Sequence, residues 1–314
     1  MMELNTCTEF LRQHDRYIII THRRPDGDTL GSAAGLCHAL NRIGKQAYLF
    51  PNPEITGTFR PYVEKYLAPS DYRWDTVIAT DVADASLICP GFDGAVDLWL
   101  DHHPTRGTPR ENAVVWSDKA SCGELIMALV ETLCGDIQPE EADLLYMAVS
   151  TDTGCFVYDN TKADTHRAAA RLMDAGANVP LLNKPLFRFK SMARILLEGM
   201  ICADMRSFRD GQISVAVITL DMFRRSGATE DDCNDLASLA GQVMGNKAAI
   251  TVRELRSDPP LTKVSIRTDG IVDASHICAL FGGGGHRMAA GCELPLPPEE
   301  TAQNVYEAVE EAWP

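Results

Sequence analysis

The sequence contains no paired cysteines, no long apolar run and few cationic side chains, and each absence excludes a class of protein. Its ten cysteines are scattered without a Cys-x-x-Cys pair, so their spacing supports neither a zinc ribbon nor a redox motif. No apolar stretch is long enough to span a bilayer, and no signal-peptide pattern opens the chain. We therefore expect a cytoplasmic protein with reduced thiols and no membrane partner.

Positive charge is scarce, because 29 Lys and Arg stand against 44 Asp and Glu, which leaves a net charge of −15. Long grooves for duplex DNA or extended RNA work by neutralising many phosphates with Lys and Arg. The composition argues against such a groove, so any nucleic-acid substrate should be short. The hydrophobic content of 45% is ordinary for a globular protein, and a length of 314 residues favours two domains.

Strand-like and helix-like segments alternate through the first half of the chain. Tyr17–Ile20 is a continuous apolar run, as expected for a parallel strand buried on both faces. Further strands are expected at 46–50, 76–80 and 96–100, and helices at 29–43, 122–133, 139–150 and 162–175. The alternation predicts an α/β fold whose first domain, residues 1–188, holds a doubly wound, mainly parallel sheet. In such sheets ligands collect at the carboxyl ends of the strands.

A second, smaller α/β domain is expected over residues 203–314, after a connecting segment at 189–202 that is largely helical. Strands are predicted at 212–218, 248–255 and 263–267, and helices at 230–244 and 298–312. Polar turns, such as the Ser-Asp-Pro-Pro of residues 257–260, separate these elements.

Five short clusters of acidic, histidine and glycine residues stand out from this background. They are His22 with Pro25–Asp28, then Asp81, Asp101-His102-His103, Asp152 and Gly282–His286. Three of the clusters directly follow strand-like runs, so one edge of the sheet should receive them. Imidazole and carboxylate groups suit divalent metals such as manganese or magnesium. The N–H groups of a glycine-rich turn can hold a phosphate.

Four of the clustered aspartates, Asp26, Asp28, Asp81 and Asp152, would repel one another without a cation. Each pair at ~4 Å costs on the order of 4 kcal/mol at an effective dielectric near 20. Several such pairs would consume much of a domain's stability, typically about 5–15 kcal/mol. Two divalent ions would balance four negative charges, and the clusters therefore predict a two-metal phosphoesterase. Each cluster alone also has a structural explanation, such as a surface turn at Pro25–Asp28 or a flexible loop at the glycines.

The chain resembles the DHH phosphoesterase family along nearly its whole length. The motif His-x-x-Pro-Asp-Gly-Asp-x-x-Gly-Ser runs from His22 to Ser32 without a gap, and Asp101-His102-His103 follows. Gly282–His286 and then Ala289-Ala290-Gly291 resemble the DHH-associated C-terminal domain, DHHA1. The length and the pairing of domains are most similar to the bacterial nano-RNase/pAp phosphatase branch. Members of that branch degrade very short oligoribonucleotides to mononucleotides and remove the 3′-phosphate of 3′-phosphoadenosine 5′-phosphate (pAp).

The resemblance implies a centre of two Mn²⁺ ions, for which Mg²⁺ or Co²⁺ could substitute. Six residues would be the ligands: His22 and Asp26 for the first ion, Asp28 and His102 for the second, Asp81 as a bridge, and Asp152 on one or both.

The resemblance also implies catalytic roles for His103, Asp101 and Asp81. His103 would face the substrate phosphate or the leaving oxygen, and Asp101 would orient an imidazole. The substrate-binding set would be His103, Arg267, Gly283, Gly284, Gly285 and His286. Two departures from the family pattern, Thr268 in place of Ser and Arg287 in place of Lys, bear on fine substrate preference rather than on phosphate binding.

The expected function is hydrolysis of short oligoribonucleotides to nucleoside 5′-monophosphates, removal of the 3′-phosphate of pAp, or both. A phosphodiesterase for cyclic or linear dinucleotides would use the same centre, and a pyrophosphatase or polyphosphatase ranks lower. A nucleotide- or RNA-binding module without turnover is the alternative from another class. The sequence specifies neither cleavage polarity nor subunit number, although members of the family are often homodimers.

Overall fold

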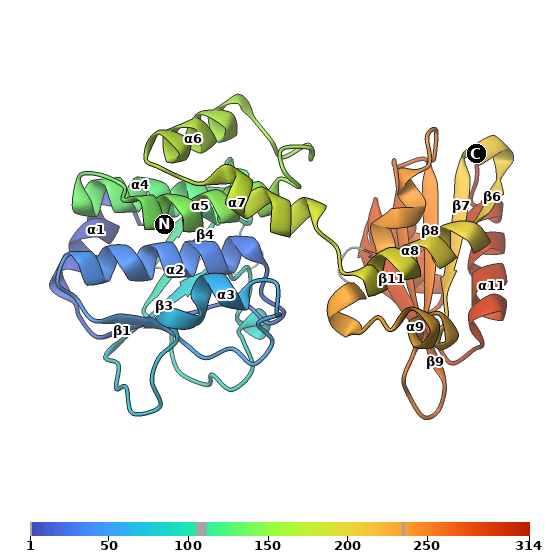
Figure 1. The fold of residues 1–314 in the computed structure, drawn as a ribbon, viewed down its shortest axis with the longest axis horizontal. Coiled ribbons are helices and arrows are strands. Elements are labelled where there is room, and N and C mark those ends of the chain that lie inside the picture. Colours follow the sequence, from blue (N-terminus) through green and yellow to red (C-terminus); the bar gives the residue numbers. More distant parts are fainter. Residues whose placement is uncertain (1, 105–111, 234–235) are drawn as a thin grey trace. The chain divides into compact units, whose positions relative to one another are not determined.

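The computed structural model describes residues 2–104, 112–233 and 236–314, and the chain forms two compact units. Unit 1 is Met1–Phe189 and unit 2 is Lys190–Pro314, and each has its own sheet and hydrophobic core (Figure 1). Within the described residues, no helix combines the length and the apolar character needed to cross a bilayer.

Unit 1 is built on five parallel strands in the order β2-β1-β3-β4-β5. The strands are β1 (Tyr17–Ile20), β2 (Ala47–Leu49), β3 (Thr76–Thr80), β4 (Leu98–Asp101) and β5 (Ala113–Val115). The α-helices are α1 (Leu4–Gln13), α2 (Gly27–Arg42), α3 (Arg60–Val63), α4 (Cys122–Cys134), α5 (Pro139–Asp152), α6 (Ala163–Asp174) and α7 (Val179–Asn183). Short helical turns lie at η1 (Glu64–Tyr66), η2 (Ala85–Leu87) and η3 (Lys184–Arg188). The predicted α/β class and the mainly parallel sheet are confirmed.

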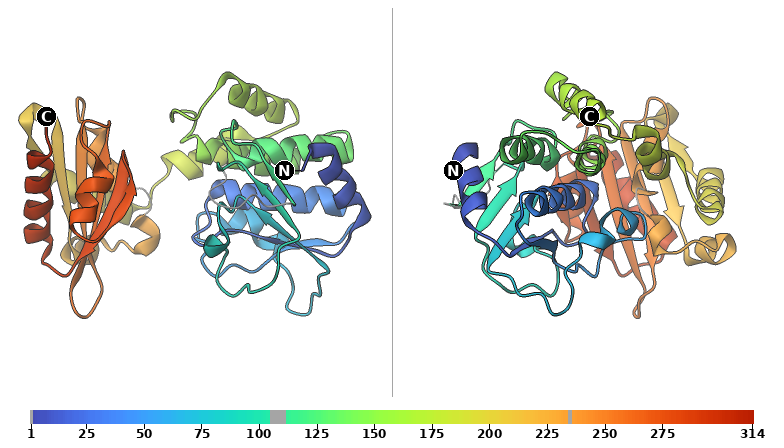
Figure 2. Two further views of the ribbon diagram at one scale, coloured as in Figure 1. Left: turned by 180° about the vertical axis from the view of Figure 1, so that it is seen from behind. Right: turned by 60° about the vertical axis from the view of Figure 1, so that its left-hand side comes forward.

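Both faces of this sheet are buried, which explains the unbroken apolar run of β1. Tyr17 and Ile19 pack into the core that α1, α2, α4 and α5 share, and these helices lie on one side of the sheet (Figures 1 and 2). Ile18 and Ile20 point to the opposite face, where residues of the connecting segments such as Phe50 cover them.

Three glycines spaced four residues apart let α2 and α5 approach closely. A Cβ atom at Gly27 would lie 2.4 Å from Thr151 Oγ1, and one at Gly31 would lie 2.4 Å from the carbonyl oxygen of Leu144. Gly35 meets the Leu145 side chain in the same way. Because the spacing of four residues places the glycines on one helix face, α5 packs along α2 and its last turn lies beside the first turn of α2.

Unit 2 contains a six-stranded sheet in the order β10-β11-β9-β8-β7-β6, antiparallel except for the β7–β8 pair. The strands are β6 (Arg206–Phe208), β7 (Ile213–Ile218), β8 (Ala248–Leu255), β9 (Leu261–Thr268), β10 (Gly284–His286) and β11 (Ala289–Leu294). The helices are α8 (Met192–Asp204), α9 (Leu220–Ser226), α10 (Ala274–Leu280), α11 (Pro298–Glu311) and the shorter η4 (Arg209–Gly211), η5 (Glu230–Cys233) and η6 (Leu236–Gln242). Residues of α10 and α11 pack on one face of the sheet, and those of α8, α9 and η6 on the other.

The helix predicted at 230–244 is wrong, because the described part of this segment forms the two 3₁₀ helices η5 and η6, while residues 234 and 235 lie outside the described residues. Asp232 accepts hydrogen bonds from the N–H and hydroxyl groups of Thr229, which support the first turn of η5. The segment then contains residues of low helix propensity, such as Gly241, which disfavour one continuous α-helix. Residues 189–202, expected as a connection, include most of α8. Leu197 and Ile201 of this helix are buried in a core of unit 2.

Candidate metal centre

Strand ends and helix ends of unit 1 bring the predicted metal ligands together. His22 follows β1, Asp81 follows β3, and the histidine pair follows β4, while α2 begins and α5 ends beside them. The ligand atoms form three groups, within each of which all atoms lie within 4.8 Å of one another. These groups are His22/Asp26/Asp81, Asp28/His102/Asp152 and Asp81/His102/His103.

The first group lies where β1 passes into α2. Asp26 is the N-cap of α2 and accepts hydrogen bonds from the N–H groups of Asp28 and Thr29, which positions its carboxylate. His22 Nε2 lies 3.6 Å from Asp26 Oδ1 and 3.7 Å from Asp81 Oδ2. The other ring nitrogen, Nδ1, lies 2.8 Å from the carbonyl oxygen of Arg23, an acceptor only, so Nδ1 carries the proton. The lone pair of Nε2 is then available to a metal.

The second group is centred on His102. Its Nε2 lies 3.6 Å from Asp152 Oδ2 and 3.7 Å from Asp28 Oδ2. Burial and the neighbouring His103 lower the pKa of His102, so the ring is neutral near pH 7. Its Nδ1 lies 3.3 Å from the carbonyl oxygen of Lys119, which again leaves Nε2 free to bind a metal.

Asp81 lies between the two groups. Its Oδ2 faces His22 Nε2 at 3.7 Å, and its Oδ1 faces His102 Nε2 at 3.4 Å. Oδ1 is buried and accepts no hydrogen bond from the described residues. The residue adopts a left-handed backbone conformation (φ 57°), which Asp tolerates, and its N–H donates to the carbonyl of Leu100. A buried carboxylate oxygen without a donor is what a metal ligand requires.

Three carboxylates of the centre, those of Asp28, Asp81 and Asp152, have raised pKa values when no cation balances their charge. Burial and then the neighbouring carboxylates raise the pKa of Asp28 and of Asp81. Burial, together with the charge of Asp26, raises the pKa of Asp152 to about 6. Divalent cations reverse this effect, because an adjacent positive charge favours the ionised form. The donor set of imidazoles and carboxylates therefore fits divalent metal ions.

Asp101 and His103 form a separate pair at the edge of the centre. Asp101 Oδ1 accepts hydrogen bonds from His103 Nδ1 at 2.9 Å and from the N–H groups of His102 and His103. This hydrogen bond and the charge of Asp101 raise the pKa of His103, against the opposing effect of burial. The His103 side chain is 45% exposed, so its Nε2 can meet a substrate.

Backbone groups that the sequence analysis did not identify hold Asp28 in place. Its two oxygens accept hydrogen bonds from the N–H groups of Cys122 (2.7 Å) and Gly123 (3.0 Å) at the start of α4, and from Ser32 Oγ (3.1 Å). A helix N-terminus stabilises a carboxylate in this way. Only Ser32 had a sequence signal, as the last residue of the first motif, because backbone donors carry none.

In unit 2 the glycine run is an edge strand rather than an open loop. β10 pairs with β11, and the register places Gly284 opposite Gly291 and Gly285 opposite Ala290. A Cβ atom at Gly283 would lie 2.3 Å from the carbonyl oxygen of Gly291. Gly285, at φ 151°, would meet the backbone of Ala289 and Ala290 at 2.6 Å, whereas Gly284 has open space. Gly283 and Gly285 thus have no room for a side chain, because the backbone of β11 occupies the space.

Arg267 and His286 lie in one row across three strands of unit 2. Arg267 of β9 is opposite Ala289 of β11, which is opposite His286 of β10. Directly opposed residues share a face of the sheet, so both side chains project from the same face with only a methyl group between them. Both residues are exposed, as a substrate-binding pair must be.

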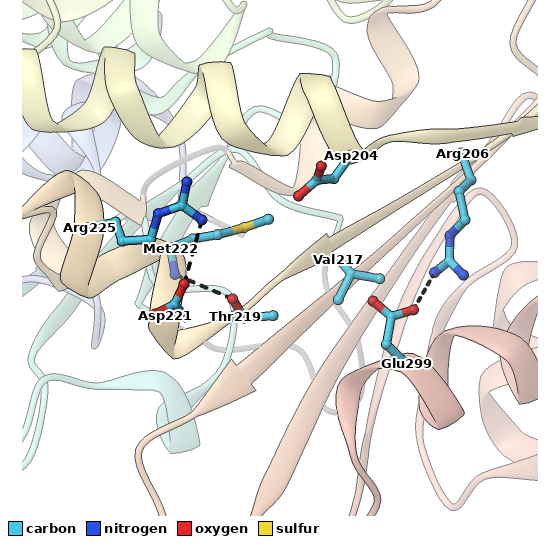
Figure 3. A pocket seen from close by; sticks show the side chains of 8 residues that line it. All are labelled: Asp204, Arg206, Val217, Thr219, Asp221, Met222, Arg225 and Glu299. Atoms are coloured by element: carbon cyan, nitrogen blue, oxygen red, sulfur yellow. Dashed lines mark hydrogen bonds and ion pairs between the residues drawn. The ribbon is translucent and has the colours of Figure 1, made fainter.

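A pocket of about 200 Å³ lies elsewhere in unit 2 (Figure 3). It is lined by Asp204, Arg206, Val217, Thr219, Asp221, Met222, Arg225 and Glu299. Arg206 pairs with Glu299 at 3.1 Å and Arg225 with Asp221 at 3.5 Å, so much of its charge is neutralised within its walls. None of the residues predicted to form the site lines this pocket.

Comparison with known proteins matches both units to families. The model of the DHH family N-terminal domain matches residues 16–149, and that of the DHHA1 domain matches residues 211–313. The bifunctional oligoribonuclease and PAP phosphatase NrnA of Thermus thermophilus is 32% identical over 93% of this chain and 89% of its own length. The protein of the same name from Bacillus subtilis is 26% identical over 91% and 93%.

Solved structures show the same fold. An exopolyphosphatase-related protein from Bacteroides fragilis superposes with a TM-score of 0.83 at 21% identity and covers 98% of this chain and 95% of its own. Exonuclease RecJ bound to manganese superposes with a TM-score of 0.57 at 15% identity, covering 99% and 94%. With both domain models matched and a 32% identical relative aligned over most of its length, the chain belongs to the DHH family of metal-dependent phosphoesterases, and its second unit carries a DHHA1 domain.

Proposed function

We propose that this enzyme uses two manganese ions to hydrolyse short oligoribonucleotides to nucleoside 5′-monophosphates and to remove the 3′-phosphate of pAp. The observation that carries the proposal is the position of Asp81, whose two oxygens face different histidines and whose Oδ1 accepts no hydrogen bond from the described residues. The names of the Thermus and Bacillus relatives supply the substrate classes.

Each ion has its own ligands in this proposal. His22 and Asp26 would hold the first ion, Asp28, His102 and Asp152 would hold the second, and Asp81 would contribute to both. When bound, such a pair of ions acts as a Lewis acid toward the phosphoryl oxygens and lowers the pKa of water enough to provide a nucleophile near neutral pH. Imidazole with carboxylate ligands suits manganese, and Mg²⁺ or Co²⁺ are the expected substitutes.

His103 acts as the general acid. Asp101 keeps the proton on Nδ1 and raises the pKa of the ring, so that Nε2 also holds a proton over a wider pH range. The partly exposed Nε2 can donate that proton to the leaving oxygen. Asp101 thus acts through His103, which it orients by accepting hydrogen bonds from the N–H group and the ring Nδ1 of that residue. It accepts a third hydrogen bond from the N–H group of His102.

The substrate phosphate not undergoing reaction binds to unit 2 in this proposal. Arg267 and His286 supply charge and hydrogen-bond donors from one face. Gly284 leaves room for close approach of a phosphate, and Gly283 and Gly285 on either side of it keep the edge strand against β11. With 29 Lys and Arg against 44 Asp and Glu, and a net charge of −15, the chain suits a small nucleotide better than a long strand.

The enzyme is proposed to act in the cytoplasm as a homodimer. All ten cysteines are free thiols, as expected in a reducing compartment. The exposed side of α8 carries three large apolar side chains, Met192, Ile195 and Leu196, which support self-association. Light scattering after gel filtration tests the subunit number.

A product time-course with Mn²⁺ tests the function. The substrates are a diribonucleotide, a 24-residue RNA, pAp, a cyclic dinucleotide and pyrophosphate, each also with a chelator. We expect rapid hydrolysis of the diribonucleotide and pAp, slow attack on the long RNA, and none after chelation. Preferential cleavage of the cyclic dinucleotide or pyrophosphate would reassign the substrate, and substrate binding without turnover would identify a binding module.

A further inference from the structure

The amide of Asn160 connects two segments that carry proposed metal ligands. Its Nδ2 donates to the carbonyl oxygen of Asp152 at 3.0 Å and to that of Ala120 at 3.1 Å. Because both neighbours are acceptors, only the NH₂ group can face them, which settles the orientation of the amide. Its Oδ1 is buried without a hydrogen-bond partner among the described residues, so the side chain is held by its donors alone.

The segment that contains Ala120 holds the other two residues of the same metal group. One residue before it, the carbonyl oxygen of Lys119 faces Nδ1 of His102 at 3.3 Å. Two and three residues after it, the N–H groups of Cys122 and Gly123 bind the carboxylate of Asp28. Asn160 therefore links Asp152 with the backbone that positions His102 and Asp28.

Neighbours of Asn160 hold the same segment at two further points. Lys162 Nζ donates to the carbonyl oxygen of Asp118. Glu124 Oε1 accepts hydrogen bonds from the N–H of Ala120 at 3.0 Å and from Thr165 Oγ1 at 3.1 Å. Both backbone groups of Ala120, its N–H and its carbonyl oxygen, are thus hydrogen-bonded. Asn160 therefore binds a backbone segment that is itself held in place.

We propose that Asn160 is a positioning residue for one ion only, the ion held by Asp28, His102 and Asp152. Among the described residues, none of its hydrogen bonds leads to His22 or Asp26, which are positioned by Arg23 and by the first turn of α2. Loss of the amide should therefore lower the affinity for this ion and leave the affinity for the other ion unchanged. The inference rests on the proposed two-metal function.

The test is the Mn²⁺ stoichiometry and affinity of Asn160→Leu, measured by calorimetric titration of the metal-free full chain. Leucine is close to asparagine in size but has no donor. We expect one ion to bind with wild-type affinity and the other about 10–100-fold more weakly, the usual effect of removing a group that orients metal ligands.

Asn41→Leu is the matched control. Asn41 Nδ2 also donates to two carbonyl oxygens, those of Cys37 and Ala47, both at 2.9 Å. Its removal should lower the thermal stability of the metal-free protein while both ions bind as in the wild type.

Lys162→Met provides a second variant, because this exposed residue can change without loss of the core. We expect it to lower the affinity for the same ion by a smaller factor. The proposal therefore stays testable if Asn160→Leu does not fold.

Retention of both ions at wild-type affinity in Asn160→Leu, or equal weakening of both, would overturn the inference. If Asn160→Leu cannot be purified, wild-type affinity of Lys162→Met for the ion held by Asp28, His102 and Asp152 would likewise overturn the inference. A wild-type chain that binds fewer than two ions would instead contradict the proposed function.

Discussion

The two units of this chain build their candidate sites in opposite ways. In unit 1 the functional carboxylates of Asp28 and Asp81 are almost fully buried. Backbone N–H groups bind the Asp28 carboxylate, whereas Asp81 is positioned by its own N–H, which donates to Leu100. In unit 2 Arg267 and His286 are exposed on an open sheet face, where two of the neighbouring glycines are fixed by backbone contact. A metal centre needs several ligands at fixed separations, whereas a substrate face needs access.

The comparison predicts that substitutions in unit 1 change metal binding and rate together, and that substitutions in unit 2 change substrate affinity alone. Buried carboxylates of like charge become stable only with cations, so metal occupancy depends on every one of them. Exposed donors contribute to binding separately, and each loss costs about one hydrogen bond.

The largest expected effect is that of Asp81→Ala. It removes the proposed bridge, and we expect kcat to fall at least about 1000-fold with bound manganese reduced by at least one ion per chain. Metal analysis and single-substrate kinetics measure both quantities. Ser226→Ala, a small change at a buried residue of unit 2, is the control variant and should keep wild-type kcat and manganese content. Near-normal turnover by Asp81→Ala would remove this residue from the centre.

Gly283→Ala should raise KM by about 10-fold or more while metal content stays at the wild-type value. The added methyl group would overlap the carbonyl of Gly291, and relief of that overlap shifts β10 at a cost of about 1–3 kcal/mol. Gly284→Ala, where a Cβ atom has open space, is the matched control and should leave the free energy of unfolding nearly unchanged. Equal effects of the two substitutions on the free energy of unfolding would mean that the edge strand is not formed in solution.

His286→Ala should weaken substrate binding about 10-fold, the loss of one good hydrogen bond, and leave manganese content unchanged. Equilibrium binding of pAp in the presence of Ca²⁺, which slows turnover in place of Mn²⁺, measures the affinity. His276→Ala in α10 of the same unit is the comparison variant. Loss of metal with unchanged substrate affinity would reverse the roles proposed for the two units.

The smallest expected effect is a pH dependence of the metal-free protein. The pKa of Asp152 is about 6 in the folded state and is near 3.8 ordinarily, so between these values the folded state binds more protons than the unfolded state. The free energy of unfolding therefore falls as pH rises from about 4 to 6. For a side chain that is 29% exposed we expect about 1–2 kcal/mol from this group.

Urea denaturation in a chelator at pH 4.5 and pH 7 measures this decrease, and Asp152→Asn should reduce it by the share of Asp152. Asp28 and Asp81, whose pKa values are also raised, add to the decrease, whereas Asp26 and Asp101, whose pKa values are lowered, oppose it. Saturating Mn²⁺ should abolish the slope, because the ions keep the carboxylates ionised. A pH dependence in the metal-free Asp152→Asn variant identical to that of the metal-free wild type would contradict the electrostatic description of the centre.

Much of the fold could be predicted from local patterns. Strands β1 and β3 begin and end at the predicted residues, 17–20 and 76–80, because a buried parallel strand is apolar along nearly its whole length. Strand β8 also has the predicted bounds, 248–255. The pairing of β10 with β11 was not predicted, since Gly284–His286 has neither apolar character nor alternation. The helix at 230–244 was predicted wrongly, because the capping contact of Thr229 with Asp232 begins only the short helix η5, and residues of low helix propensity such as Gly241 disfavour its continuation.

The sequence by itself determined the kinds of groups available for chemistry and the ends of strands on which many of them lie, since residue type and apolar runs are local properties. Only the tertiary structure decided that Asp81 faces two histidines, that Gly27 and Gly31 admit α5 beside α2, and that Asn160 links Asp152 to Ala120. These relations join residues far apart in the chain through close packing and backbone hydrogen bonds. Backbone donors and acceptors are nearly the same at every position, so the pattern of side chains does not predict which of them will form these hydrogen bonds.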